Sequence, residues 1–93
     1  MEKLTEAQVA SALEELKGWE HENGFIVKSF VFNDFKDAFG FMTRVAFEAE
    51  AQCHHPNWEN VYHTVIIRLQ THDVDGITSN DIQLAQTIEK IFN

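Results

Sequence analysis

The sequence has little of what marks a secreted or membrane-bound protein. Its 93 residues contain a single cysteine, Cys53, which has no second thiol for an intramolecular disulfide and so gives no reason to expect an oxidising compartment. No uninterrupted apolar run approaches the ~20 residues that a transmembrane helix requires. The first residues also show no apolar segment behind a basic start, the pattern of a secretory leader. We therefore expect a cytoplasmic protein with no membrane partner, and a nuclear pool as well if its source is a eukaryote.

Basic residues are also scarce. Seven Lys and Arg stand against fifteen Asp and Glu, which gives a formal net charge of -8. The basic residues are scattered from Lys3 to Lys90 and do not gather in one segment. Such a chain repels the phosphate backbone of nucleic acids. We therefore expect no direct binding of DNA or RNA.

The chain contains one proline and four glycines, and it has no linker, repeat or low-complexity segment. Hydrophobic residues, by contrast, make up 44% of the chain and include eight Phe and two Trp, which is enough for a packed interior. A chain of this length forms one core and not two. We therefore expect a single folded domain over residues 1–93.

Capping boxes and a hairpin signal divide the chain into helices and strands. Thr5 with Gln8 places the start of a first helix, and a similar pair begins the last helix after residue 78. Asn23-Gly24 predicts a type I′ turn, because both central positions of that turn need positive φ. The expected elements are helices over residues 6–16, over 35–52 and after 78, strands over 19–22 and 25–32, and a hairpin over 58–71 that turns near 62–63.

The order of these elements is α-β-β-α-β-β-α. Hairpins and helices in this order predict an α+β fold, in which a four-stranded antiparallel sheet carries three helices on one face. Two tryptophans, Trp19 and Trp58, are expected to serve packing, since large aromatic side chains usually do.

The middle helix carries more apolar side chains than one buried face holds. Helical periodicity predicts a buried stripe that consists of Phe35, Ala38, Phe39, Met42, Val45, Ala46 and Ala49. Phe47 lies well off that stripe and would face water unless another molecule covers it. We therefore expect self-association to bury Phe47.

Three of the five histidines, His54, His55 and His72, fall in predicted loops beside strands, where proteins commonly present functional side chains. Histidine titrates near neutral pH, so it can give a proton to a leaving group and recover one. Adjacent loop histidines are also common as ordinary solvated residues, and spacing alone leaves both interpretations open. His21 and His63 are expected at the surface.

Other chemical roles are weaker alternatives. Cys53 and the three loop histidines could supply metal ligands, but no known metal-binding motif is present. A Cys53-His54 nucleophile is disfavoured, because neighbours in sequence generally point apart. Asp81 is expected at the third position of the last helix, where it bonds back to Thr78 and can also accept a ring proton from a histidine.

Seven positions in fixed register carry a resemblance to a known family. They are Glu50, His54, His55, Pro56, Tyr62, His72 and Asp81. This pattern resembles the signature of the pterin-4a-carbinolamine dehydratases. Residues 39–46, Gly18-Trp19, Trp58 and residues 60–62 are also similar to the family, so the resemblance covers nearly the whole chain.

The resemblance implies an activity and a site. The activity is dehydration of 4a-hydroxytetrahydrobiopterin to quinonoid dihydropterin and water, which recycles the pterin cofactor of aromatic amino-acid hydroxylases without a metal or organic cofactor. Catalysis or substrate orientation would fall to His54, His55 and His72, with Asp81 supporting the site. The residues expected to contact the pterin are Cys53, His54, His55, Pro56, Gln70, Thr71, His72 and Asp73.

The resemblance also implies partners. Family members are usually dimers or tetramers, which agrees with the uncovered Phe47. Some members bind a homeodomain transcription factor and stabilise its dimer, so a non-catalytic, protein-binding role is the alternative function. One departure is His63, since relatives often carry Asn after the tyrosine, and Asn tolerates left-handed turn geometry better.

Overall fold

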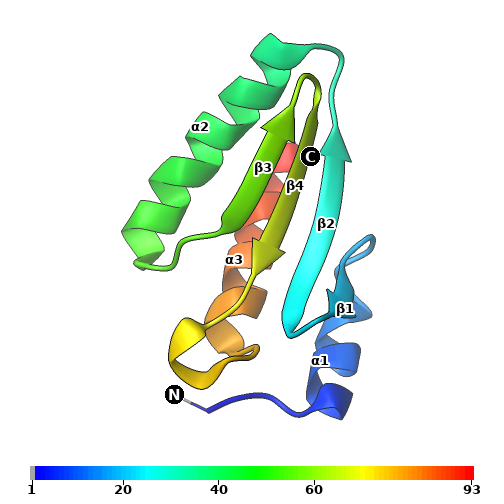
Figure 1. The fold of residues 1–93 in the computed structure, drawn as a ribbon, viewed down its shortest axis with the longest axis vertical. Helices are drawn as coiled ribbons and strands as arrows, with labels where there is room; N and C mark the ends of the chain where they lie inside the picture. The colour runs from blue at the N-terminus through cyan, green and yellow to red at the C-terminus, as the bar shows by residue number, and fades with distance from the viewer. Residues whose placement is uncertain (1) are drawn as a thin grey trace.

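The computed structural model describes residues 2–93 and contains the predicted order of three helices and four strands (Figure 1). A short 3-10 helix, η1, is added before the last helix. The elements are α1 Glu6–Leu13, β1 Glu20–Glu22, β2 Phe25–Val31, α2 Phe35–Gln52, β3 Asn57–Val61, β4 Thr64–Leu69, η1 His72–Val74 and α3 Ser79–Phe92. Among these residues no helix combines the length and the hydrophobicity that crossing a membrane requires.

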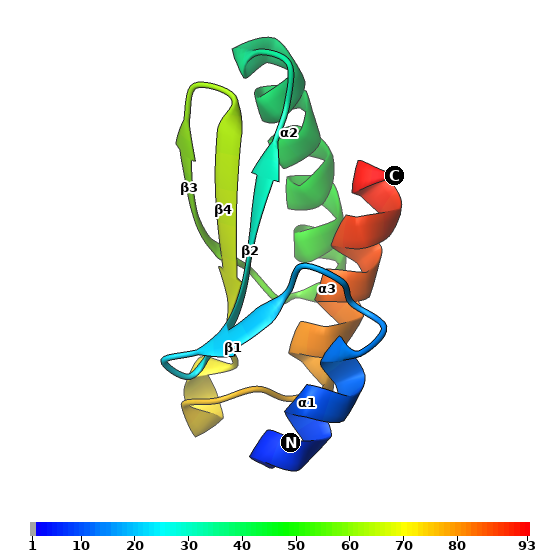
Figure 2. The same cartoon turned by 90° about the vertical axis from the view of Figure 1, so that its right-hand side faces the viewer.

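The four strands form one antiparallel sheet in the order β1-β2-β4-β3. Figure 2 shows the sheet edge-on, with the helices on one side of it. The predicted α+β fold is therefore confirmed. Along the central strand β4, Val65, Ile67 and Leu69 are buried, while the residues between them are only partly covered, as expected when alternate side chains face opposite sides.

The buried face of α2 differs from the predicted stripe. Phe41, which the prediction left out, is fully buried and packs on Phe30 at 5.1 Å and on Phe32 at 4.9 Å between ring centroids. Phe35 and Phe39, which it included, are 51% and 55% exposed. The helix turns Phe41 toward the sheet because Phe30 of β2 and Phe32 just after it offer aromatic partners there, and helical periodicity alone does not contain this information. The residues of α2 that are buried are Ala38, Phe41, Val45 and Ala49.

The first helix is shorter than predicted. It ends at Leu13 and not at Leu16, and the amides of Glu14 and Leu16 bond to carbonyls three residues back. These tighter turns bring Leu16 and Trp19 inward, where they are 4% and 5% exposed. Burial of two large side chains therefore outweighs continuation of the helix.

Both predicted hairpin turns are present. Asn23 and Gly24 have φ values of 55° and 80°, as a type I′ turn requires. The second turn falls at Tyr62 and His63, where Tyr62 has a φ of 51°. Asn60 supports it, since its side-chain amide donates to the carbonyls of Tyr62 and Thr64 at 3.1 and 2.9 Å.

Candidate active site

The end of α2 places the first group of predicted site residues. Cys53 ends the helix in the left-handed conformation, with φ 54°, and the amide of His54 then bonds to the Ala49 carbonyl at 3.1 Å. Pro56 follows, and a proline disfavours helix in the residue before it. The chain therefore turns sharply between α2 and β3 and presents His54 and His55 at the corner.

The second group lies on the loop after β4. Thr71 forms an isolated bridge with Gly76, whose carbonyl accepts from the Thr71 amide at 2.8 Å. This bridge closes a short loop around η1, which the sequence did not predict. Because η1 begins at His72, the loop holds this histidine at the end of the sheet beside the α2–β3 corner.

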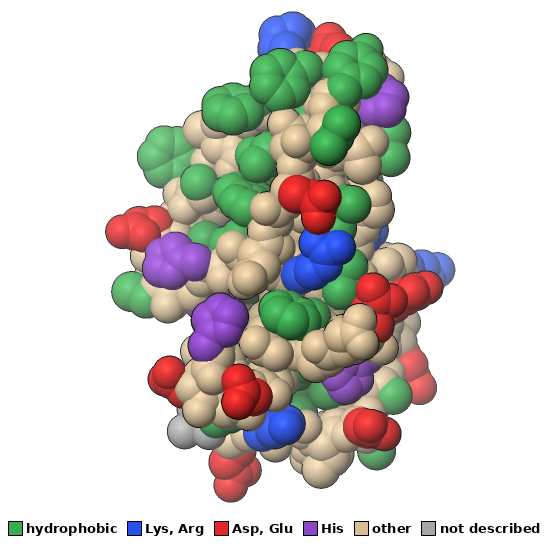
Figure 3. Space-filling model, in the orientation of Figure 1, with side chains coloured by type: hydrophobic (Ala, Val, Ile, Leu, Met, Phe, Trp, Pro, Cys, Tyr) green, Lys and Arg blue, Asp and Glu red, His purple; other side chains and the backbone are tan. Residues whose placement is uncertain are grey.

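A hollow of about 460 Å³, which we call the histidine pocket, separates the two groups. All eight residues predicted to contact substrate line it, and so do two that were not predicted, Asn57 and Asn80. The lining residues are Cys53, His54, His55, Pro56, Asn57, Gln70, Thr71, His72, Asp73 and Asn80. In Figure 3, histidine side chains (purple) lie close to one another at the left of the face in view, and others lie apart from them at the upper right and the lower centre. The structure thus brings together the residues that lead into β3 and the residues that follow β4.

Asp81 lies fully buried behind the histidine pocket and bonds to three groups. Its Oδ1 lies 2.6 Å from Nε2 of His54, and its Oδ2 accepts from the Thr71 hydroxyl at 2.7 Å and from the Thr78 amide at 2.9 Å. The predicted capping box is confirmed, and the same carboxylate lies within hydrogen-bond distance of a histidine, His54. These donors compensate a carboxylate that burial alone would strongly disfavour.

The three histidines have different surroundings. The side chain of His54 is only 11% exposed and lies against Asp81. His55 is 63% exposed, and its Nε2 lies 2.9 Å from a carboxylate oxygen of Glu50, which is also exposed. His72 is exposed, and within residues 2–93 its ring has no hydrogen-bond partner. Glu50 was part of the family pattern, yet its pairing with His55 had not been predicted.

The metal-site alternative finds no support in the geometry. In the part of the chain that the structure describes, no three His, Cys, Asp or Glu side chains lie in an arrangement that would hold a metal ion. Cys53 lines the histidine pocket but has no hydrogen bond to a neighbouring imidazole.

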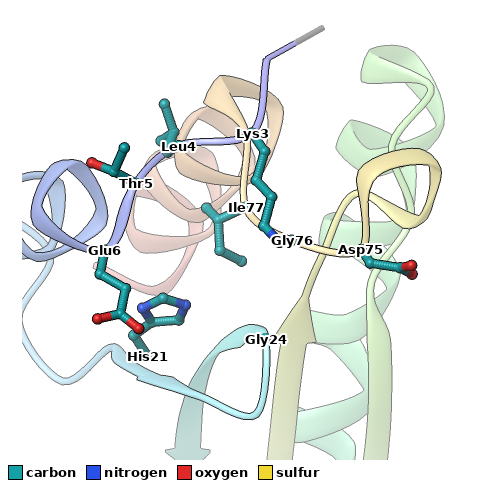
Figure 4. A pocket seen from close by; sticks show the side chains of 9 residues that line it. All are labelled: Lys3, Leu4, Thr5, Glu6, His21, Gly24, Asp75, Gly76 and Ile77. Atoms are coloured by element: carbon teal, nitrogen blue, oxygen red, sulfur yellow. The ribbon is translucent and has the colours of Figure 1, made fainter.

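A second hollow, of about 450 Å³, opens between the N-terminal segment, the β1–β2 turn and residues 75–77 (Figure 4). Leu4 and Ile77 form its apolar part, and its charged or titratable lining residues are Lys3, Glu6, His21 and Asp75. It contains none of the predicted site residues and no buried acid–base pair. The histidine pocket is therefore the better candidate for catalysis.

Comparison with known proteins identifies the family. The profile of the family described as pterin 4 alpha carbinolamine dehydratase matches residues 2–91. A protein of Christiangramia forsetii, provisionally named pterin-4-alpha-carbinolamine dehydratase, is 50% identical over 91 residues, which are 98% of this chain and 94% of the relative. A protein of Opitutus terrae with the same provisional name is 49% identical over 89 residues, 95% of this chain and 92% of the relative.

The fold agrees with these matches. The crystal structure of a transcriptional coactivator/pterin dehydratase from Brucella melitensis superposes with a TM-score of 0.96 and is 40% identical. The match covers 99% of this chain and 100% of that one. On the sequence profile, the relatives and the fold together, the chain belongs to the pterin-4a-carbinolamine dehydratases, a family of hydro-lyases.

Proposed function

We propose that the histidine pocket binds pterin-4a-carbinolamine and that His54, His55 and His72 catalyse the loss of water from it. The observation that carries the proposal is the His54–Asp81 pair in the wall of the pocket, where a buried carboxylate holds an imidazole at 2.6 Å. The pocket volume of about 460 Å³ falls in the range of ~300–1,000 Å³ typical of small-molecule sites.

The proposed reaction needs one acid and one base. The N5 lone pair of the substrate forms the C4a–N5 double bond as the bond from C4a to the hydroxyl breaks. An imidazolium protonates the departing oxygen, which leaves as water, and a base accepts the proton of N5. The product is quinonoid dihydropterin, and the two proton transfers balance. No oxidant, reductant, metal or organic cofactor takes part.

The activity is tested by following the absorbance of enzymatically generated 4a-carbinolamine with and without the protein. We expect the protein to accelerate the decay of the carbinolamine and the appearance of quinonoid dihydropterin. The spontaneous reaction in buffer is the control. A decay rate that does not depend on protein concentration would reject the dehydratase function, and with it a role in recycling the cofactor of aromatic amino-acid hydroxylases.

We also propose that the exposed side of α2 associates with a second copy of the chain. Phe35, Phe39 and Phe47 are 51%, 55% and 71% exposed there. Gly40 follows Phe39 in the sequence, and a Cβ added to it would meet nothing within 4 Å. A glycine inside a helix costs roughly 1 kcal/mol relative to alanine, and no contact within this chain requires it. The close approach of a helix from a second copy would explain the glycine at position 40.

Phe47→Glu is expected to shift the protein from dimers or tetramers to a smaller species, since it places a charge in the apolar contact. Sedimentation velocity at micromolar concentration measures the change. Gln86→Glu adds the same charge at an exposed position of α3 and is expected to leave the sedimentation coefficient unchanged. A wild-type protein that sediments as a monomer would contradict the proposal.

A protein-binding role is the second candidate function. The Brucella melitensis neighbour is described as a transcriptional coactivator as well as a pterin dehydratase, and the exposed phenylalanines of α2 form a surface that a helical partner can cover. In this case a transcription factor would compete with self-association. A protein that binds such a partner but does not accelerate the dehydration would favour this role over the enzyme.

A further inference from the structure

Two buried threonine hydroxyls stand behind the His54–Asp81 pair. Thr78 is fully buried and Thr71 is 8% exposed, and their hydroxyl oxygens lie 2.7 Å apart. The Thr71 hydroxyl donates to Oδ2 of Asp81 at 2.7 Å. A hydroxyl has one proton to give, so in the bond between the two threonines Thr78 is the donor. Its oxygen in turn accepts from the Asn80 amide at 3.2 Å. The hydrogen bonds therefore all run toward Asp81.

These bonds to Asp81 indicate which ring nitrogen of His54 carries the proton. Both acceptor sites of Oδ2 are used by Thr71 and the Thr78 amide, which leaves Oδ1 for His54. An ionised carboxylate only accepts hydrogen bonds, so Nε2 of His54 must carry a proton. In the neutral ring, Nδ1 is then the nitrogen with the free lone pair.

The free nitrogen is not sealed inside the protein. Within residues 2–93, Nδ1 of His54 has no hydrogen-bond partner, and no buried side-chain nitrogen or oxygen lacks one. Nδ1 must therefore reach accessible space, and His54 lines the pocket. We propose that Thr71 is a positioning residue, which acts through Asp81 to hold His54 so that it exchanges its proton with the bound pterin at Nδ1. The inference rests on the proposed dehydratase function for its catalytic part only.

The geometry favours this role for Thr71 over a side-chain contact with the substrate. Its hydroxyl is already bonded to Asp81 and Thr78 in the interior, so what it offers the pocket is backbone and methyl group. Without that hydroxyl, Oδ2 keeps only the Thr78 amide, and the carboxylate can turn its second oxygen toward other donors. The imidazole then loses its single preferred tautomer and orientation.

The tautomer is measured directly by ¹⁵N NMR of the ring nitrogens at about pH 8, where histidine is ordinarily neutral. In the wild-type protein without ligand, we expect a protonated-type shift for Nε2 of His54 and an unprotonated-type shift for Nδ1. Thr71→Val is expected to move both shifts toward the average of a mixed population, and Thr71→Ser to restore them. A wild-type His54 ring that is protonated at Nδ1 would overturn the inference. This measurement does not depend on whether a variant folds.

Kinetics test the catalytic part. We expect Thr71→Val to lower kcat about 10-fold with little change in KM, as loss of a supporting hydrogen bond does at comparable histidines, and Thr71→Ser to recover most of the loss. Thr87→Val is the matched control, since it removes a hydrogen-bonded hydroxyl on α3 outside the pocket. In a His54→Ala background, Thr71→Val should cause no further loss.

The outcomes separate this inference from the proposed function. A wild-type protein that does not accelerate the dehydration rejects the proposed function, whereas the NMR shifts still decide the tautomer. A Thr71→Val protein with a reduced kcat but unchanged ¹⁵N shifts, or with an equal loss in the His54→Ala background, rejects the positioning role and leaves the dehydratase function intact.

Discussion

His54→Ala is expected to lower kcat for carbinolamine dehydration by roughly 10²- to 10⁴-fold, the contribution typical of a positioned acid or base. The reason lies in its surroundings. The ring is 11% exposed, is held by Asp81 at 2.6 Å and lines the histidine pocket. Removal of the ring deletes the group that would donate or accept the proton. It also deletes the hydrogen-bond partner of the buried Asp81 carboxylate. Stopped-flow absorbance with generated substrate measures the rate.

His63→Ala is the matched control for this prediction. His63 lies at the β3–β4 turn, stacked on Tyr62 with ring centroids 4.4 Å apart, and Figure 1 shows this turn at the opposite end of the sheet from η1. We expect His72→Ala to lower the rate as well, and His63→Ala to lower it less than either. Circular dichroism should show the same fold in all three variants. Equal losses would contradict the assignment of the site.

Asp81→Asn should reduce both stability and activity. The side chain is fully buried and accepts from His54, Thr71 and the Thr78 amide. An amide of the same shape has one acceptor oxygen and presents an NH₂ group to at least one of these donors. We expect the free energy of unfolding to fall by about 3 kcal/mol, the cost of breaking a buried polar network. Urea denaturation followed by circular dichroism measures it.

The same substitution is expected to lower kcat about 100-fold, since the wrong tautomer of His54 would then be favoured. Glu50→Gln is the control at the other carboxylate–histidine pair. That pair is exposed, with Glu50 and His55 at 83% and 63%, so its loss should change the free energy of unfolding by less than about 0.5 kcal/mol. If the two substitutions destabilise the protein equally, burial is not what distinguishes the two pairs.

Much of the fold could be predicted because its signals are local. The capping boxes at Thr5 and Thr78 involve contacts three residues apart, and the Asn23-Gly24 turn depends on the φ preferences of two residues. The split of residues 58–71 at Tyr62-His63 was also correct. The resemblance to the family then implied eight substrate-contact residues, and all eight line one pocket.

Other features could not be predicted from local patterns. The end of α1 depends on how Leu16 and Trp19 reach the core, and the buried face of α2 depends on Phe30 and Phe32. The pocket residues Asn57 and Asn80 carried no signal of their own, since one simply follows Pro56 and the other lies in the first turn of α3. Each of these features is decided by contacts with segments distant in sequence.

The sequence by itself determined where the helices and hairpins begin, and which histidines lie at loops beside strands. Only the tertiary structure decided that His54, and not its neighbour His55, meets the buried carboxylate of Asp81, which lies 27 residues further along the chain. The physical reason is the strand order β1-β2-β4-β3, which sets the end of β4 and the start of α3 beside the α2–β3 corner. Adjacent residues at that corner point in different directions, so one imidazole becomes buried and paired while the other stays in solvent.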